Sequence, residues 1–296
     1  MQAAEKDSKK DKALPRWLGP LVIGGTFLLI FAAERRRPLR ERREPSAVRT
    51  SRNLTMAMLS AGSVAILQPL LLIPLLRRVE SRRLGLLHRL PLSGAARTVL
   101  GVLLLDYTLW WWHWMNHRIP FLWRFHLPHH VDLDLDASTA IRFHFGEMSL
   151  SVLYRMLQIR LLGAGELSIS LWQLLLFPSI FFHHSNLALT EAQDRLLSRL
   201  VVTPRMHGIH HSDYQKETDS NWSSILSVWD LLHGTFREDI PQQSIRLGVP
   251  AWQNLEDVAL ERVILMPFAE QRDDWRNENG ELQISRGVSS HALAGD

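Results

Sequence analysis

Histidine is concentrated in four short stretches of the chain, at spacings that suit a metal site. The sequence contains 14 histidines and no cysteine. The stretches are an HxxxH pattern, an HxxHH pattern, an adjacent pair and a second HxxHH pattern: His113 and His117; His126, His129 and His130; His183 and His184; His207, His210 and His211. Residues at i, i+3 and i+4 share one face of an α-helix, so each pattern predicts imidazoles aimed at a common point.

The number of histidines predicts two metal ions rather than one. Neutral imidazole binds iron, zinc, copper and nickel. A zinc site uses three or four protein ligands, whereas at least nine histidines stand in these patterns. Because the sequence has no cysteine, it excludes disulfides, thiolate-ligated haem and iron–sulfur clusters. Any metal must therefore be held by His, Asp, Glu or Asn.

Several carboxylates are placed to orient these rings. The candidates are the acidic run 132–136 (DLDLD), Glu147 and Asp230. A solvated loop is the alternative for 132–136, which follows a histidine pattern. Asp106 lies in an apolar run seven residues before His113, where a carboxylate is costly. We expect Asp106 to accept a hydrogen bond from a ligand histidine or a buried arginine; the alternative is a position near the membrane interface.

Apolar runs predict the helices that must position these groups, because a helix needs roughly 17 to 25 apolar residues to cross a bilayer. The runs are 17–33, 54–76, 98–115, 148–159 and 167–182. The first run is expected to be a retained anchor rather than a signal peptide, since it is long and lacks a good cleavage site. The last two runs predict a spanning or re-entrant hairpin, of which 148–159 is the weaker half.

Two local signals bear on the HxxHH patterns. Thr203 and Pro204 predict a helix start just before His207, as an N-cap and a first-turn proline. Pro128 lies inside the earlier pattern and predicts a break there, so that this pattern straddles a helix start.

The connectors 34–53 and 77–89 are rich in arginine, and the sequence pI is about 9.7. These arginines flank apolar runs, where they suit anionic lipid headgroups. We therefore expect a membrane and not a nucleic acid as the partner of this basic chain.

The order of these blocks resembles the fatty acid hydroxylase and sterol desaturase superfamily, which consists of membrane-bound di-iron oxygenases. The resemblance covers roughly residues 98–240. Besides the HxxxH pattern, the segments that carry it are 122-LWRFHLPHH-130, 139-TAIRFHFGE-147, 184-HSN-186, 203-TPRMHGIHHSD-213 and 217-ETDSNWSSILSVWDLLHGTF-236. The sequence departs from the family pattern at Trp114, which replaces an arginine, and at Phe145, which replaces a proline.

The resemblance implies a set of metal ligands and neighbours. The ligands are His113, His117, His126, His129, His130, His184, His207, His210 and His211. His144 is a candidate further ligand or pocket residue, and His183 is a neighbour rather than a ligand. Asn186, together with Asp106 and Asp230, is expected to support the ligands from outside.

The expected fold is all-α: an integral membrane bundle of about four transmembrane helices with a cytosolic helical cap that holds a dimetal site. We expect two membrane helices with basic connectors in 1–97, a catalytic domain in 98–240 and a polar tail in 241–296. The site is expected to lie on the cytosolic side, in a bacterial inner membrane rather than in the endoplasmic reticulum.

The resemblance implies an enzyme that hydroxylates or desaturates an aliphatic C–H bond of a lipid or sterol. Its cofactor would be two non-haem iron ions, with zinc as a substitute, and it would take O₂ and electrons from an external donor. The alternatives are a histidine-rich metal transporter and a non-enzymatic zinc-binding membrane protein. Transporter ligands should line a path near the midplane of several spans, whereas these histidines lie at span ends.

Overall fold

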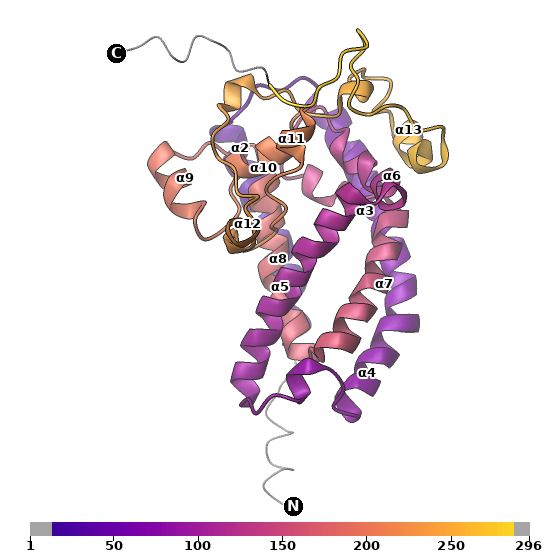
Figure 1. The fold of residues 1–296 in the computed structure, drawn as a ribbon, viewed down its shortest axis with the longest axis vertical. Helices are drawn as coiled ribbons and strands as arrows, with labels where there is room; N and C mark the ends of the chain where they lie inside the picture. The colour runs from indigo at the N-terminus through magenta and orange to yellow at the C-terminus, as the bar shows by residue number, and fades with distance from the viewer. Residues whose placement is uncertain (1–13, 287–296) are drawn as a thin grey trace, which may run out of the picture.

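The computed structural model describes residues 14–286, and every regular element among them is helical. The α-helices are α2 (Leu18–Arg36), α3 (Ser46–Leu67), α4 (Ile73–Ser81), α5 (Gly94–Arg118), α6 (Pro120–His130), α7 (Phe145–Leu162), α8 (Glu166–His184), α9 (Glu191–Leu197), α10 (Pro204–His210), α11 (Gln215–Thr218), α12 (Val228–His233) and α13 (Leu260–Leu265) (Figure 1). A π-helical segment, Gln68–Leu72, joins α3 to α4. The prediction of an all-α fold is confirmed.

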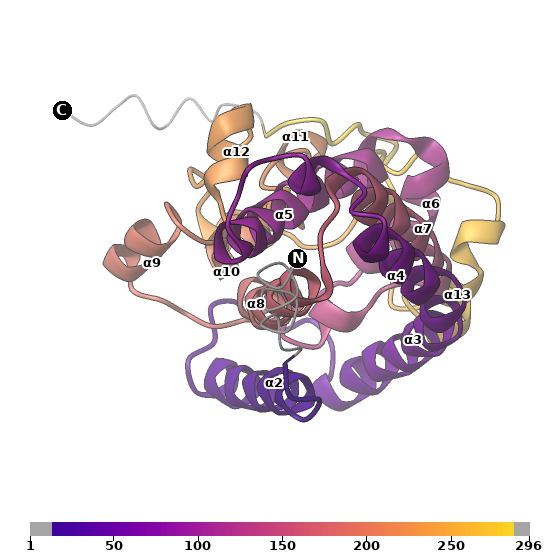
Figure 2. The ribbon, with the colours of Figure 1, turned by 90° about the horizontal axis from the view of Figure 1, so that it is seen from below.

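The long helices form a bundle in which α8 lies between α2 and α5 (Figure 2). Three helical segments of the described chain are long and apolar enough to cross a membrane: Leu18–Arg36, Ser46–His88 and Glu166–His184. They correspond to three of the predicted apolar runs, 17–33, 54–76 and 167–182. The other two runs are also helical, in α5 and α7, but these helices fall outside that set.

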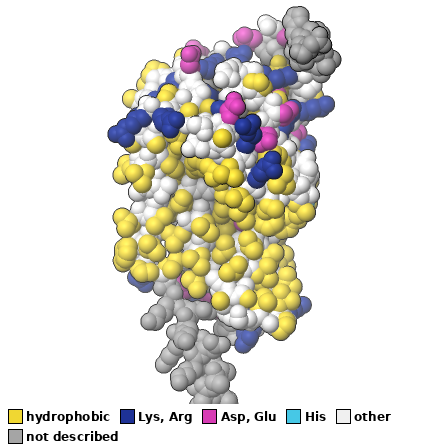
Figure 3. Space-filling model, turned by 90° about the vertical axis from the view of Figure 1, so that its left-hand side faces the viewer, with side chains coloured by type: hydrophobic (Ala, Val, Ile, Leu, Met, Phe, Trp, Pro, Cys, Tyr) yellow, Lys and Arg dark blue, Asp and Glu magenta, His cyan; other side chains and the backbone are white. Residues whose placement is uncertain are grey.

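The bundle surface is apolar over much of its height. On the side shown in Figure 3, hydrophobic side chains cover the lower and middle part, and Lys and Arg side chains gather mainly above them. Exposed leucines such as Leu29 on α2, Leu70 and Leu153 on α7 face outward rather than into the core. An apolar belt of this size marks a membrane-contacting surface.

The short helices form a cap at the upper end of the bundle, where α5 and α8 end (Figure 1). Residues from the chain after 241 pack into this cap. Val249, Trp252, Val263 and Met266 share a buried apolar cluster with Leu127 of α6. This packing ties the C-terminal part of the described chain to a helix that carries three of the histidines.

Helix α6 runs without interruption through Pro128, so the predicted break at this residue is wrong. Proline inside a helix costs about 3 kcal/mol, because it removes one hydrogen bond and crowds the preceding turn. Tertiary packing offsets that cost here. Pro128 is buried in the cap, and its carbonyl oxygen accepts a hydrogen bond from Arg142 Nε at 2.8 Å.

The acidic run after α6 is neither a solvated loop nor a set of partners for the histidine rings. Asp132 and Asp136 are buried and both accept hydrogen bonds from Arg49 of α3. Burial raises the pKa of Asp132, but the charges of Arg49 and Arg142 outweigh this and hold the pKa below its usual value. The run therefore fastens the segment after α6 to α3.

Candidate metal centre

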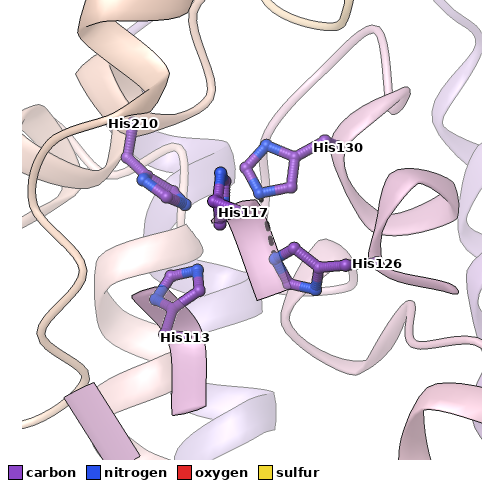
Figure 4. Close-up of side chains that lie close together, drawn as sticks. All are labelled: His113, His117, His126, His130 and His210. Carbon is purple, nitrogen blue, oxygen red and sulfur yellow. Dashed lines mark hydrogen bonds between the residues drawn. The ribbon is translucent and has the colours of Figure 1, made fainter. Parts of the chain in front are cut away.

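The structure gathers all nine histidines of the expected ligand set into two buried groups. Within each group the candidate nitrogen atoms all lie within 4.8 Å of one another. Group 1 consists of His113, His117, His126, His130 and His210, and group 2 consists of His129, His184, His207 and His211. In Figure 4 the rings of group 1 surround a common space. Four helices and the residue after α10 bring together positions up to 98 residues apart in the sequence.

Each HxxHH pattern is divided between the two groups, so the prediction that one pattern aims at one point is wrong. His126 and His130 join group 1, whereas His129 between them joins group 2. Helix α10 repeats this division, because His207 and His211 join group 2 and His210 joins group 1. Adjacent residues on a helix point about 100° apart, since 3.6 residues complete a turn. A histidine and its sequence neighbour therefore face different centres.

The nitrogen atoms of group 2 face each other at short range. His184 Nε2 lies 3.1 Å from His129 Nε2 and 2.9 Å from His207 Nε2, and His211 Nε2 lies 3.1 Å from His207 Nε2. In group 1 the His126 and His130 Nε2 atoms are 3.2 Å apart. The two groups adjoin, because the rings of His130 and His211 are stacked with centroids 4.4 Å apart.

Backbone carbonyl groups hold three of the rings from the side opposite the centre. His113 Nδ1 lies 2.8 Å from the Trp222 carbonyl oxygen, and His210 Nδ1 lies 2.8 Å from that of Ser220. His184 Nδ1 meets the Ile180 carbonyl oxygen at 2.8 Å. A carbonyl can only accept, so each Nδ1 carries the proton and each Nε2 lone pair is free for a metal ion.

Glu147 supports a fourth ring with a charge. Its Oε1 atom lies 2.9 Å from His126 Nδ1, and both side chains are buried. Glu147 lies in the first turn of α7, next to the turn of α6 that carries His126. A carboxylate on the outer nitrogen of a ligand imidazole fixes the ring and makes its inner nitrogen more basic.

Glu147→Gln is expected to weaken metal binding by roughly 10- to 100-fold, the usual cost of losing such a partner. The neutral amide still fills the space but no longer raises the basicity of His126. Titration of the metal-free protein with Fe²⁺ or Co²⁺ measures the change. Glu261→Gln, at an exposed position on α13, is the matched control and should bind as the parent does. Equal affinities in the two variants would contradict this role of Glu147.

Burial keeps the imidazoles neutral and thus ready to bind a metal ion. It lowers the pKa of His129, His130, His207 and His211 well below the ordinary value, and lowers that of His210 to about 3. Repulsion between neighbouring histidines adds to the effect. A metal ion competes with protons for the same nitrogen lone pair, so at neutral pH it would displace few protons here.

The donor set fits two imidazole-bound transition-metal ions. His117 Nε2 and His210 Nε2 are buried and have no hydrogen-bond partner among the described residues. A buried polar atom without a partner costs about 1–3 kcal/mol, and a metal ion at the centre of group 1 would satisfy both. Nine neutral nitrogen donors suit iron or zinc and are unlike the oxygen sites preferred by magnesium and calcium.

The three expected supporting residues contact no ring of either group directly. Asp106 accepts hydrogen bonds from Trp229 Nε1 at 2.6 Å and from the Leu226 amide at 3.2 Å, so the expected histidine or arginine partner is wrong. The Asn186 side chain accepts a hydrogen bond from the Arg40 amide and donates one to the Arg40 carbonyl oxygen, both at 2.8 Å. These two bonds join the α2–α3 connector to the end of α8.

Asp230 acts on the site through the backbone. Its carboxylate accepts from the Trp222 and Ser223 amides, both at 3.0 Å, and from Trp110 Nε1 at 2.9 Å. The carbonyl group of Trp222 is the acceptor for His113. Asp230 thus fixes the turn that orients a group 1 ring.

The two remaining histidines near the site lie outside both groups. His144 caps the start of α7, where its Nδ1 accepts from the Gly146 amide, and its Nε2 lies 3.0 Å from the Ile264 carbonyl oxygen. His183 is buried beside group 2, with its ring centroid 4.2 Å from that of His207.

Asp274 and the supporting carbonyl groups were not predicted from the sequence. Asp274 accepts from Trp123 Nε1 at 2.8 Å and from Trp252 Nε1 at 2.6 Å. The ring of Trp123 packs 5.0 Å from His117 and 5.4 Å from His130, measured between centroids. No local pattern links residues 151 positions apart, and every residue has a carbonyl group, so neither feature has a sequence signal.

The fold and the site define a helical membrane protein with a paired histidine centre at one end of its bundle. Residues 98–235 match the family model described as fatty acid hydroxylase. These 138 of the 296 residues carry the match, which confirms the resemblance seen in the sequence.

Characterised relatives carry similar sequences. An ornithine lipid hydroxylase of Rhizobium tropici is 31% identical over 157 residues, which cover 52% of this chain and 46% of the relative. Alkylglycerol monooxygenases of Xenopus tropicalis and Homo sapiens are 28% and 27% identical, over 47% and 45% of this chain and 29% of each relative. The chain thus spans less than half the length of each of these relatives. No solved structure matches it significantly.

Proposed function

We propose that the chain is a membrane-bound lipid hydroxylase with a non-haem di-iron centre. The observation that carries the proposal is the pair of adjoining histidine groups at one end of an apolar bundle. Group 1 contains five histidines and group 2 contains four. The named relatives, which are a lipid hydroxylase and alkylglycerol monooxygenases, favour hydroxylation over desaturation.

Group 1 and group 2 would each hold one iron ion. Bound iron would supply the activation of O₂ that an unactivated C–H bond requires. The residues of the chain provide the rest: they orient the imidazoles through carbonyl groups and Glu147, and they exclude water by burial. In the net reaction one oxygen atom of O₂ enters the C–H bond, and the other leaves as water with two electrons and two protons.

The electrons would come from a separate donor, because the chain has no cysteine for an iron–sulfur cluster or a thiolate-ligated haem. We place the histidine end on the cytosolic side of a bacterial inner membrane, where such a donor is accessible. The connector 34–53 lies at this end, next to Asn186, whereas Leu84 and Gly85 of the second basic connector touch the α7–α8 turn at the opposite end. Because the two basic connectors lie at opposite ends of the bundle, arginine content alone does not determine which end faces the cytosol.

We propose that the substrate is an aliphatic lipid. The relatives act on ornithine lipids and alkylglycerols by name, and here the bundle beneath the site is apolar on its outer surface. Metal transport is less consistent with this arrangement, because both groups lie in the cap rather than along a path through the bundle.

The test uses the full chain loaded with iron in lipid nanodiscs. The protein is supplied with ¹⁸O₂, a chemical or protein reductant and a panel of phospholipids, aminolipids and ether lipids. Mass spectrometry should find a lipid product that gains one ¹⁸O atom, only when iron and reductant are present. A product that has lost two hydrogen atoms and gained no oxygen would indicate desaturation. No iron-dependent product, together with one zinc per chain, would refute the proposal.

A further inference from the structure

Helix α12 and the segment before it pack against α5 and α8, on the bundle side of His113. Ser179 Oγ, inside the candidate span α8, donates to the Ser224 carbonyl oxygen at 2.7 Å. Trp229 Nε1 of α12 reaches Asp106 of α5 at 2.6 Å. Asp106 lies 12 residues before the end of α5, about 18 Å along the helix at 1.5 Å per residue. Figure 1 shows α12 below α10 and α11, next to the upper half of α5.

The inner face of α12 is firmly anchored to α5. The His233 ring stacks on Trp110 with centroids 4.0 Å apart, and its Nε2 lies 3.2 Å from the Tyr107 hydroxyl. Asp230 is buried and binds four groups of the surrounding turn and of α5. The position of α12 against α5 is therefore held by both packing and hydrogen bonds.

The outer face of α12 is apolar and uncovered. Val228, Leu231 and Leu232 are all exposed, and Leu232 retains 66% of its accessible surface. The neighbouring α9 segment extends this face, because the Ser227 amide donates to the Leu200 carbonyl oxygen at 3.2 Å. We call the surface made by these residues the α9–α12 shelf: Leu196, Leu200, Val228, Leu231 and Leu232.

The shelf has the charge pattern of a lipid interface. Arg195 and Leu196 of α9, and Arg199 and Leu200 in the turn after it, are two adjacent exposed Arg–Leu pairs. Arginine at such an edge keeps its stem on apolar surface and its guanidinium among anionic headgroups. The side of the molecule that carries α9 and α12 is the one in Figure 3, where the apolar surface continues from the bundle up to the arginines.

We propose that the α9–α12 shelf is inserted into the headgroup–acyl boundary of the same bilayer that the bundle crosses. The bilayer is the occupant because the shelf is continuous with the lipid-facing belt, lies at the depth of Ser179 and Asp106, and is edged by arginine. In this arrangement lipid reaches the helix whose Asp230 fixes the turn that orients His113.

Spin labelling tests the insertion in the full chain. Because the sequence has no cysteine, a single Leu232→Cys variant takes one nitroxide label. The labelled protein is placed in liposomes of zwitterionic and anionic phospholipid, and its collisions with O₂ and with a water-soluble nickel complex are compared by power saturation. The ratio of O₂ accessibility to nickel accessibility at the 232 label should be at least threefold higher than the same ratio at a Leu282→Cys label. Leu282 is an exposed control position in the C-terminal part of the cap. Leu29→Cys on α2, which is 73% exposed, provides the lipid reference.

Two results would overturn the proposal. A label at 232 that matches Leu282→Cys would place the shelf in water. A label with low access to both reagents, broadened by a second label nearby, would mean that a second copy of the chain covers the shelf. Neither readout depends on metal or turnover, so the insertion can fail while the hydroxylase proposal stands.

Discussion

His130→Ala and His207→Ala are each expected to abolish lipid hydroxylation and to lower bound iron from about two ions per chain to about one or fewer. His130 belongs to group 1 and His207 to group 2. Loss of an outer partner alone typically costs 10- to 100-fold, so loss of a ligand should exceed about 100-fold in turnover. Elemental analysis gives the iron content, and the mass of the lipid product gives the activity.

The two groups should also respond together, because the His130 and His211 rings stack across their boundary. We therefore expect each variant to perturb the iron spectrum of both centres. His88→Ala is the control, since His88 lies at the opposite end of the bundle beside Gly163. Full iron content in His207→Ala, with normal turnover, would show that group 2 holds no catalytic metal.

Arg49→Ala is expected to produce the largest loss of stability of any single substitution outside the histidines. The Arg49 side chain is 2% exposed and binds Asp132, Asp136, Thr139 and the Asp134 carbonyl oxygen. Removing it leaves the buried Asp136 without its cation and deprives Asp132 of its bidentate partner, which costs about 3–5 kcal/mol. The apparent melting temperature in detergent should fall by roughly 10 °C. Arg42→Ala, at an exposed position of the same connector, should change it little.

A second variant separates the charge effect from a general packing defect. Arg49→Met combined with Asp136→Asn removes the cation and the carboxylate of Asp136, while Asp132 keeps Arg52 and Arg142 within 4.0 Å, so this double variant should recover part of the loss. Arg49→Lys should not recover it, because one ammonium group cannot replace the bidentate contact to Asp132. A double variant no more stable than Arg49→Ala would mean that the unpaired charge of Asp136 is not the cause.

Local patterns were sufficient for the long helices and for the nine histidines of the site. Apolar runs located all five long helical segments, because burial in lipid or in a core requires such runs wherever they occur. Thr203 caps α10 by accepting from the Met206 amide, as predicted, because capping depends only on neighbouring residues. All nine expected histidines lie in the two groups, while their role as ligands and the domain boundaries stay predictions.

The sequence by itself determined which residues are available: the helices, the histidines and the lack of cysteine all follow from local composition and spacing. Only the tertiary structure decided how they combine. The division of each HxxHH pattern between two centres depends on which helix faces each side of α6 and α10. The continuity of α6 through Pro128 and the burial of Asp132 depend on Arg142 and Arg49, which lie 14 and 83 residues away. Contacts at such separations are set by packing, and no local pattern encodes them.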